Sequence, residues 1–155
     1  MRTVITHFFN EEYLLPWWLM HHRKFFDHGI MINYDSTDRS VDIIKEYCPT
    51  WDIVTSRNRQ FGAVECDHEV MDYESSVKGW KTCLNVTEFM IGDFSLLDDK
   101  PDQLLIAPCY IMVDSDTSNN DKLTYDEPLI KQKPHGIFYD PAEPITIERC
   151  CRGIH

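Results

Sequence analysis

The sequence predicts an α/β fold in which helices cover both faces of a mostly parallel sheet, a three-layer sandwich. Short β-branched and aromatic runs alternate with helix-like segments over the first 90 residues. Strands separated by a helix pair in parallel through right-handed crossovers, and such sheets are covered on both faces. The composition agrees, because 43% hydrophobic residues and four tryptophans can supply one packed core. We therefore expect a single domain over residues 1–155.

The expected elements follow the order β-α-β-α-β-α-β. Glu11 and Glu12 are expected to open the first helix, where carboxylates complement the helix dipole. The second helix is expected to stop before Pro49, and Gly79 is expected to break the third. The predicted strands are 3–9, 30–33, 51–55 and 81–89, and the predicted helices are 11–27, 41–47 and 63–77.

Beyond Met90 the alternation is replaced by a less regular pattern. The apolar run 104–113 predicts a strand, or a strand pair interrupted at Pro108, and a polar loop is expected at 114–126. Further short strands are predicted at 136–139 and 145–150. The sequence shows no internal repeat and no sign of a second domain.

Composition narrows the classes of partner. The formal net charge of -11 argues against nucleic acid, whose phosphates need clustered lysine and arginine. The longest apolar run is about half of the roughly 20 residues that a membrane-spanning helix needs. The N-terminus lacks the pattern of a signal peptide, so we expect a cytoplasmic protein. The six cysteines have no metal-finger spacing and are expected to be reduced thiols: Cys48, Cys66, Cys83, Cys109, Cys150 and Cys151.

Three polar segments are expected at one edge of the predicted sheet. In an open parallel sheet, ligands bind beyond the carboxyl ends of the strands. The segments 10–12, 34–38 and 85–88 follow or end predicted strands, and all three are rich in hydrogen-bonding and anionic groups. A nucleotide diphosphate sugar needs acceptors for its base and ribose, and an oxygen-ligated cation for its pyrophosphate. These segments could supply both.

The order of these motifs resembles the family 2 glycosyltransferases of the GT-A fold. The first strand ends in Asn-Glu and is followed by LPWWLMHHRKFFDHGI, which is similar to that family's opening strand and its E-W-L-x-H-H helix. The piece Ser36-Thr37-Asp38-Arg39-Ser40 resembles the family's D-D-x-S-x-D loop, which holds the nucleotide. The stretch 79–89 occupies the place of a strand that ends in D-x-D-E-F.

The resemblance covers about residues 1–95 and implies a GT-A-like (nucleotide-diphospho-sugar transferase) sandwich. On this basis residues 1–95 are the nucleotide-binding half and residues 96–155 the acceptor-side half. The implied activity is transfer of a sugar from a nucleotide-sugar donor to a hydroxyl acceptor such as a glycan. The chain is short for such a domain, so we expect a C-terminally truncated or minimal version.

The expected nucleotide site draws on the loops after the first three strands. Ser36 to Asp38 could alternatively be only a capping loop for the next helix, since these residue types favour that position. The arginine after the third strand could approach a phosphate or stay in an exposed loop. The candidate nucleotide-binding residues are Asn10, Glu11, Asn33, Tyr34, Asp35, Ser36, Asp38 and Arg57.

The expected metal site departs from the family pattern. Asn85 and Thr87 stand where the resemblance places the two aspartates that hold a divalent cation, and only Glu88-Phe89 match. Neutral oxygens hold Mg²⁺ or Mn²⁺ less strongly than carboxylates do. Glu88 could hold the cation alone, the cation could be absent, or activity could be lost. His155 is a further candidate ligand, and Asp114 with Asp116 form an alternative D-x-D pair.

Other groups leave the assignment open. His21 and His22 are adjacent and point to different faces of a helix, which favours a packed or surface pair over a metal site. No general base matches a motif, although Asp126, Glu127 and Asp140 are available.

Two other functions compete with the transferase, namely a non-catalytic binding module of this fold and an unrelated nucleotide-binding α/β protein. Against the second, no glycine-rich phosphate loop follows any predicted strand.

Overall fold

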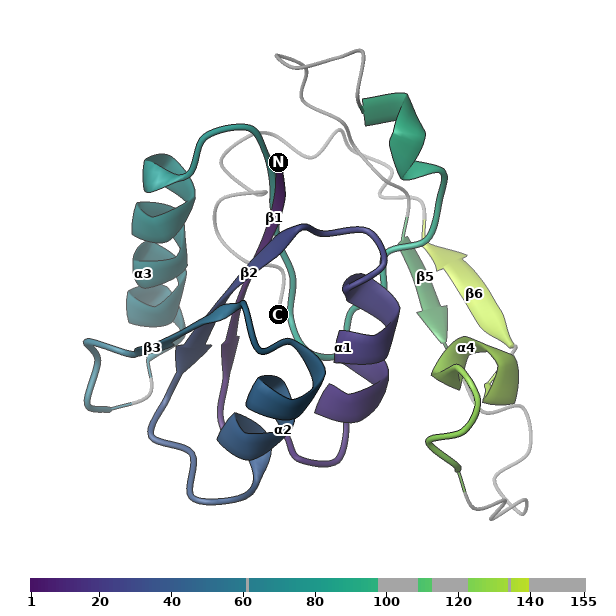
Figure 1. The fold of residues 1–155 in the computed structure, drawn as a ribbon, viewed down its shortest axis with the longest axis horizontal. Helices are drawn as coiled ribbons and strands as arrows, with labels where there is room; N and C mark the ends of the chain where they lie inside the picture. The colour runs from purple at the N-terminus through teal and green to yellow at the C-terminus, as the bar shows by residue number, and fades with distance from the viewer. Residues whose placement is uncertain (61, 98–108, 113–122, 134, 140–155) are drawn as a thin grey trace.

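The computed structural model describes residues 1–60, 62–97, 109–112, 123–133 and 135–139 (Figure 1). Within them the predicted α/β order from the first strand to the fourth is confirmed. The elements are β1 (Arg2–Phe8), α1 (Leu15–His22), β2 (His28–Asn33), α2 (Ser40–Tyr47), β3 (Asp52–Thr55), α3 (Ala63–Ser76) and β4 (Trp80–Cys83). The four strands form one sheet in the order β3-β2-β1-β4, and every neighbouring pair is parallel.

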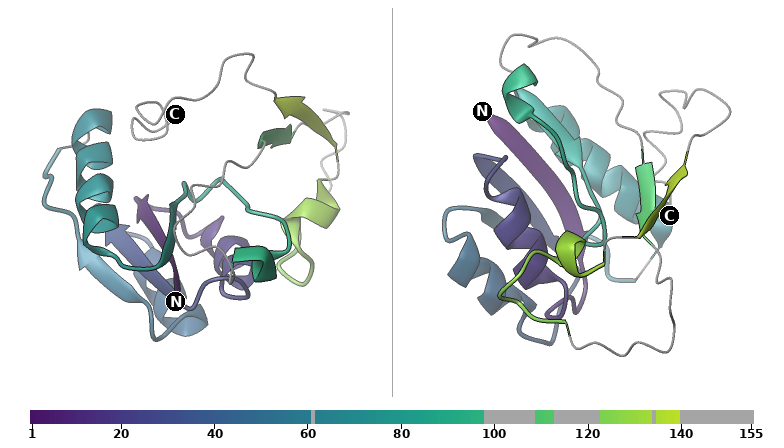
Figure 2. Two further views of the ribbon diagram at one scale, coloured as in Figure 1. Left: turned by 90° about the horizontal axis from the view of Figure 1, so that it is seen from above. Right: turned by 90° about the vertical axis from the view of Figure 1, so that its right-hand side faces the viewer.

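The sheet lies between two layers of helices (Figure 2). Alternate residues of each strand point to opposite faces. On one face Val4, Phe8 and Met31 belong to a core cluster shared with α1 and α2. On the other face Ile5 and its neighbours on β2 pack against three apolar residues of α3 and its C-cap: Val70, Tyr73 and Val77. The three-layer prediction therefore holds for this part of the chain.

Helix α1 is shorter than the sequence predicted. It begins at Leu15 rather than at Glu11, because the Glu11 carbonyl closes a turn by accepting from the amides of Leu14 and Leu15. Pro16 then occupies the first helical turn, where a missing N–H costs no internal bond. The predicted end at 27 is also too late, since the helix ends at His22. The first turn of α1 therefore contains no acidic residue.

Strand β4 ends at Cys83, six residues before the predicted end at 89. Its last backbone contact to β1 is the Leu84 amide, which donates to the Ile5 carbonyl at 3.0 Å. The chain then folds into a turn in which the Glu88 amide donates to the Asn85 carbonyl at 3.0 Å. The 85–88 segment is therefore a turn that follows the carboxyl end of β4.

The later described elements include a second, two-stranded sheet. Strand β5 (Cys109–Met112) pairs antiparallel with β6 (Gly136–Tyr139), and the short helix α4 (Leu129–Gln132) precedes β6. A 3-10 turn, η1 (Phe94–Leu97), follows the parallel sheet. Strand β6 confirms the prediction at 136–139, and β5 falls inside the predicted run 104–113. The predicted strand at 145–150 lies outside the described residues.

Two further expectations meet the structure in part. Cys48, Cys66 and Cys83 form no disulfide, whereas Cys109 is described in its backbone only and the last two cysteines lie outside the described residues. Among the described helices, none is long and apolar enough to cross a membrane.

Candidate functional site

The sheet order locates a topological switch point between β1 and β4. From β1 the chain proceeds outward to β2 and β3, and then returns to place β4 on the other side of β1. Loops leaving the carboxyl ends of β1 and β4 therefore diverge at this boundary, where open parallel sheets bind ligands. The predicted segments at 10–12, 34–38 and 85–88 all follow carboxyl ends of this one sheet.

The loops after β1 and β2 are joined by hydrogen bonds from Asn10. Its side-chain oxygen accepts from the amides of Thr37 at 2.8 Å and Asp38 at 3.3 Å, and its own amide donates to Ser36 Oγ at 3.0 Å. Asn10 (φ 53°) and Asp35 (φ 58°) both lie in the left-handed region, which non-glycine residues rarely adopt. Asn and Asp are the non-glycine residues that enter this region most readily, so both positions suit the tight turns of these loops.

The same two loops are also joined through Glu11 and Glu12. The Glu11 amide donates to Ser40 Oγ at 2.8 Å, and the Glu12 amide donates to Asp38 Oδ2 at 3.0 Å. The Glu12 carboxylate accepts from the Arg39 amide at 3.0 Å, just before α2 begins. The prediction that these carboxylates open the first helix is therefore wrong, because Glu12 binds the start of α2 instead.

The capping alternative for Ser36 to Asp38 is correct in one respect. Asp38 Oδ1 accepts from the amide of Ser40, the first residue of α2, at 2.9 Å. Although burial alone raises the pKa of Asp38, hydrogen bonds from Ser40 and Glu12 outweigh it and lower the pKa. Asp38 is therefore a firmly ionised structural acceptor. Its role as a cap is compatible with ligand binding by its neighbours.

Glu11 is the carboxylate that this network leaves available. Its side chain is half-buried, and among the described residues no donor is bonded to it. Burial, and then the nearby charge of Asp38, raise the pKa of Glu11. A half-buried carboxylate without a bonded donor can accept from O–H or N–H groups of a ligand, such as ribose hydroxyls and base amines.

Asn33 and Tyr34 support the second loop from the end of β2. Asn33 Oδ1 accepts from the Ser36 amide at 2.9 Å, which closes a tight turn around Asp35. The Tyr34 hydroxyl donates to the Gln60 carbonyl, so its ring spans from β2 to the loop before α3. Both predicted residues therefore lie at the carboxyl edge, and both are engaged in holding the loops there.

Arg57 is oriented by α3. Its guanidinium pairs with Asp72 at 2.6 Å, and its amide donates to Glu69 Oε1 at 2.8 Å. Glu69 is 3% exposed and also accepts from Ser56 Oγ at 2.6 Å and Asn58 Nδ2 at 3.0 Å. Sequence analysis missed this buried carboxylate, because helical spacing alone does not show which acidic residue of α3 meets a polar loop. The structure brings Arg57 together with α3, and no bond links it to the other predicted residues.

The 85–88 turn does not fit a chelating metal site. Glu88 Oε2 accepts from the Asn85 amide at 2.7 Å, so the carboxylate closes its own turn. Asn85 and Thr87 supply only neutral oxygens. Among the described residues, no three His, Cys, Asp or Glu side chains gather as a metal group. The other predicted ligands, Asp114, Asp116 and His155, lie outside the described residues, as does the candidate base Asp140.

Consecutive tryptophans on α1 each hold one polar turn. Trp18 Nε1 donates to the carbonyls of Asn85 at 3.1 Å and Glu88 at 3.0 Å. Trp17 Nε1 donates to the carbonyls of Thr124 at 2.9 Å and Glu127 at 3.1 Å. In both cases one indole N–H is shared by the first and fourth carbonyls of a four-residue turn. The sequence signal was the pair of tryptophans itself, which sequence analysis counted only toward the packed core.

The two histidines of α1 contact the backbone N–H and C=O of one residue, Met90. His22 is fully buried, its Nδ1 lies 3.0 Å from the Trp18 carbonyl, and its Nε2 accepts from the Met90 amide at 3.2 Å. His21 Nε2 lies 2.6 Å from the Met90 carbonyl. Burial, and then the neighbouring His21, lower the pKa of His22 to about 3. The preferred interpretation as a packed pair therefore agrees with the structure.

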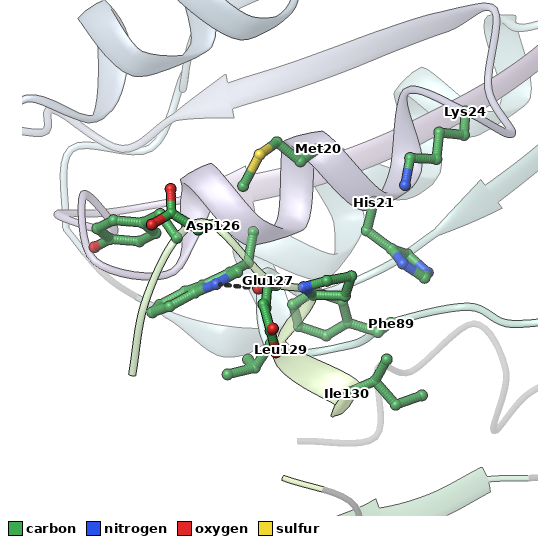
Figure 3. Close-up of a pocket in the computed structure, with 11 residues that line it drawn as sticks. Met20, His21, Lys24, Phe89, Asp126, Glu127, Leu129 and Ile130 are labelled. Carbon is green, nitrogen blue, oxygen red and sulfur yellow. Dashed lines mark hydrogen bonds between the residues drawn. The ribbon is translucent and has the colours of Figure 1, made fainter. Parts of the chain in front are cut away.

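A cavity of about 200 Å³ lies between α1 and residues 125–130 (Figure 3). Aromatic side chains of Trp17, Phe89 and Tyr125 line it, together with Lys24 and the carboxylates of the 124–127 turn. Sequence analysis did not predict this pocket, because it joins segments more than 100 residues apart. It is separate from the Asn10 network, although Tyr125 donates to the carbonyl of Tyr13, just after that network, at 3.1 Å.

No protein-family model matches the chain, and no curated protein matches it.

Proposed function

We propose that this chain is a GT-A-like glycosyltransferase of the family 2 type, which binds a nucleotide-sugar donor at the carboxyl edge of its parallel sheet. The proposal takes the acceptor to be a hydroxyl group of a glycan or a similar molecule. The observation that carries it is the joined pair of loops after β1 and β2, in which Asn10 fixes the second loop beside the switch point. The sequence resemblance assigns these same loops to the nucleotide.

The chemistry of the edge supports a nucleoside more directly than a pyrophosphate. Glu11 is a half-buried acceptor without a described partner, and Asp35 is exposed at the tip of the second loop. Both can accept hydrogen bonds from ribose hydroxyls or from the base. The one nearby cation predicted for phosphate, Arg57, is paired with Asp72. Donor binding on this proposal rests first on the nucleoside.

A second candidate function is a non-catalytic nucleotide-sugar-binding module. The observation in its favour is the 85–88 turn, where Glu88 binds its own backbone and both neighbours are neutral. A site of this composition gives little stabilisation to a departing diphosphate. Dependence on Mn²⁺ or Mg²⁺ is therefore tested separately from donor binding. Both candidate functions predict donor binding, but only the transferase predicts turnover of the donor.

Calorimetry with UDP-, GDP- and dTDP-sugars, each with and without Mn²⁺, tests donor binding. We expect one nucleotide class to bind, and Glu11→Gln to weaken that binding by roughly tenfold through loss of a charged acceptor. Glu46→Gln on the exposed side of α2 is the matched control and should bind like the wild type. The absence of binding to every donor would overturn both candidate functions, and equal binding by both variants would overturn the placement at Glu11.

Turnover separates the two candidates. Release of free nucleoside diphosphate from the bound donor, with a panel of glycan acceptors present, supports the transferase. Tight donor binding without release under the same conditions supports the binding module. If Mn²⁺ strengthens binding, Glu88→Ala and Asp114→Ala are compared, and the variant that abolishes the metal effect identifies the metal turn.

A further inference from the structure

The pocket between α1 and residues 125–130 combines aromatic walls with charged groups at its two ends. Trp17, Phe89 and Tyr125 provide the walls. In Figure 3, Lys24 lies at one end of the pocket and Asp126 at the other. The volume of about 200 Å³ lies below the range of drug-sized pockets, which begins near 300 Å³, so it suits a single ring.

The acidic end of the pocket is held in a fixed position. Besides Trp17, the Gln132 side chain donates to the carbonyls of Thr124 at 2.7 Å and Glu127 at 2.8 Å. Gln132 Oε1 also accepts from the Thr124 amide at 2.8 Å. The turn that carries Asp126 and Glu127 is therefore bonded at both ends before any ligand arrives. The backbone of this turn therefore needs little further ordering when a ligand binds to its side chains.

The charged groups that face the pocket have unused hydrogen-bonding capacity. In the part of the chain that the structure describes, neither Lys24 nor the Glu127 carboxylate makes a side-chain hydrogen bond or ion pair. The bond described for the Asp126 carboxylate comes from Thr124 Oγ1 at 3.2 Å. The pocket thus offers carboxylate acceptors from Asp126 and Glu127 and, at the end away from Asp126, the Lys24 ammonium as a donor.

These groups favour a neutral ligand that carries hydroxyl groups. An anion such as a phosphate would meet two carboxylates against one ammonium, in a chain of net charge -11. A purely apolar ring would make no hydrogen bonds to the exposed charged groups of the pocket. A sugar ring presents hydroxyl donors and acceptors at its rim, while its C–H face can pack on the electron-rich face of an aromatic ring. A sugar ring can therefore pack its C–H face on the aromatic walls and direct its hydroxyl groups to the charged side chains.

We infer that this pocket binds a neutral sugar ring, and that the ring belongs to the acceptor of the transfer. The second part rests on the proposed function. Its structural support is the Tyr125 hydroxyl, which donates to the Tyr13 carbonyl at 3.1 Å. Tyr13 directly follows Glu11 and Glu12, whose amides join the donor-side loops. The acidic end of the pocket is thereby attached to the edge where the donor is proposed to bind.

The indole N–H signals of the ¹⁵N-labelled protein report on the pocket directly. The probes are methyl β-D-glucopyranoside, methyl α-D-mannopyranoside and N-acetylglucosamine, with glucose 6-phosphate and indole as the anionic and apolar comparisons. We expect at least one neutral sugar to shift the Trp17 signal at millimolar concentration, with no shift of Trp51, which lies in the core beside α2. Asp126→Asn and Lys24→Met should each weaken this binding by roughly threefold to tenfold. The control Asp42→Asn, on the exposed side of α2, should not.

Each other outcome contradicts a defined part of the inference. A stronger response to glucose 6-phosphate, a response to indole alone, or no response to any sugar overturns the sugar site. Retained sugar affinity in both pocket variants does the same. Donor affinity is measured separately by calorimetry and by Glu11→Gln. Sugar binding at Trp17 without donor binding supports the sugar site and overturns its role as an acceptor site.

Discussion

Acidification should destabilise this protein through the buried imidazole of His22. In the folded chain, Nδ1 is the proton donor to the Trp18 carbonyl, because Nε2 must accept from the Met90 amide. Adding a second proton would bring an N–H against the Met90 N–H in a fully buried site. Burial, and then His21, accordingly lower the pKa from 6.5 to about 3.

The sign and size of the change in the free energy of unfolding with pH follow from proton linkage. Between the two pKa values the unfolded chain binds a proton that the folded chain does not, so the free energy of unfolding falls as the pH falls. Each pH unit in that window costs about 1.4 kcal/mol. At about pH 5, which is about 1.5 units below the unfolded pKa, the loss attributable to His22 is about 2 kcal/mol. This value requires only that the folded pKa lies well below 5.

Urea unfolding followed by far-ultraviolet circular dichroism, at about pH 7.5 and about pH 5, measures this loss. The comparison is His22→Gln, which does not titrate and whose side-chain oxygen can still accept from Met90. The wild type should lose about 2 kcal/mol more than the variant over this interval. His28, a half-buried histidine that lies 3.3 Å from Asp52, is the control, and His28→Gln should not reproduce that difference. Parallel pH dependences of the wild type and His22→Gln would refute the assignment of His22 as a neutral buried acceptor.

Three further substitutions test how the site is supported. Glu69→Ala leaves three donors in the loop after β3 without their carboxylate acceptor. We expect a loss of about 1–3 kcal/mol in the free energy of urea unfolding and faster amide exchange in that loop. Unchanged amide exchange would contradict this. Gly29→Ala places a Cβ in steric clash with the Trp51 ring and should cost about 1–3 kcal/mol, and a Trp51→Leu background should reduce that cost. Trp18→Phe removes the shared N–H from the 85–88 turn and should cost about 1–3 kcal/mol, with increased exchange at the Glu88 amide as the local readout.

Local patterns in the sequence were sufficient to predict in which order the strands and helices of the parallel sheet follow one another along the chain. Val4 and Ile5 are neighbours that face opposite helical layers, and residues 3–6 are all buried, as expected for a strand covered on both sides. The boundaries were less accurate where a polar contact overrode a propensity. Glu11 and Glu12 were assigned to a helix start by their type, and their amides instead bind Ser40 and Asp38 in the next loop.

The candidate site was predictable only where its partners are close in the sequence. The loops after β1 and β2 are about 26 residues apart, and a crossover of normal length brings them to the same edge. The buried Glu69 carboxylate accepts from donors in the loop after β3, and the helical pattern of α3 does not reveal this contact. Trp17 binds a turn more than 100 residues away, and no periodicity or motif encodes such a pairing.

Helix α1 explains why adjacent tryptophans are needed rather than one. Successive residues of a helix point about 100° apart, so two neighbours reach two different surroundings. Trp18 faces the sheet and holds the 85–88 turn, whereas Trp17 faces the 124–127 turn. Helix α1 also begins shortly after the loop at 10–12, which is hydrogen-bonded to the loop after β2. The proposed donor edge and the proposed sugar pocket are therefore built on one rigid element, and a displacement of α1 would move both together.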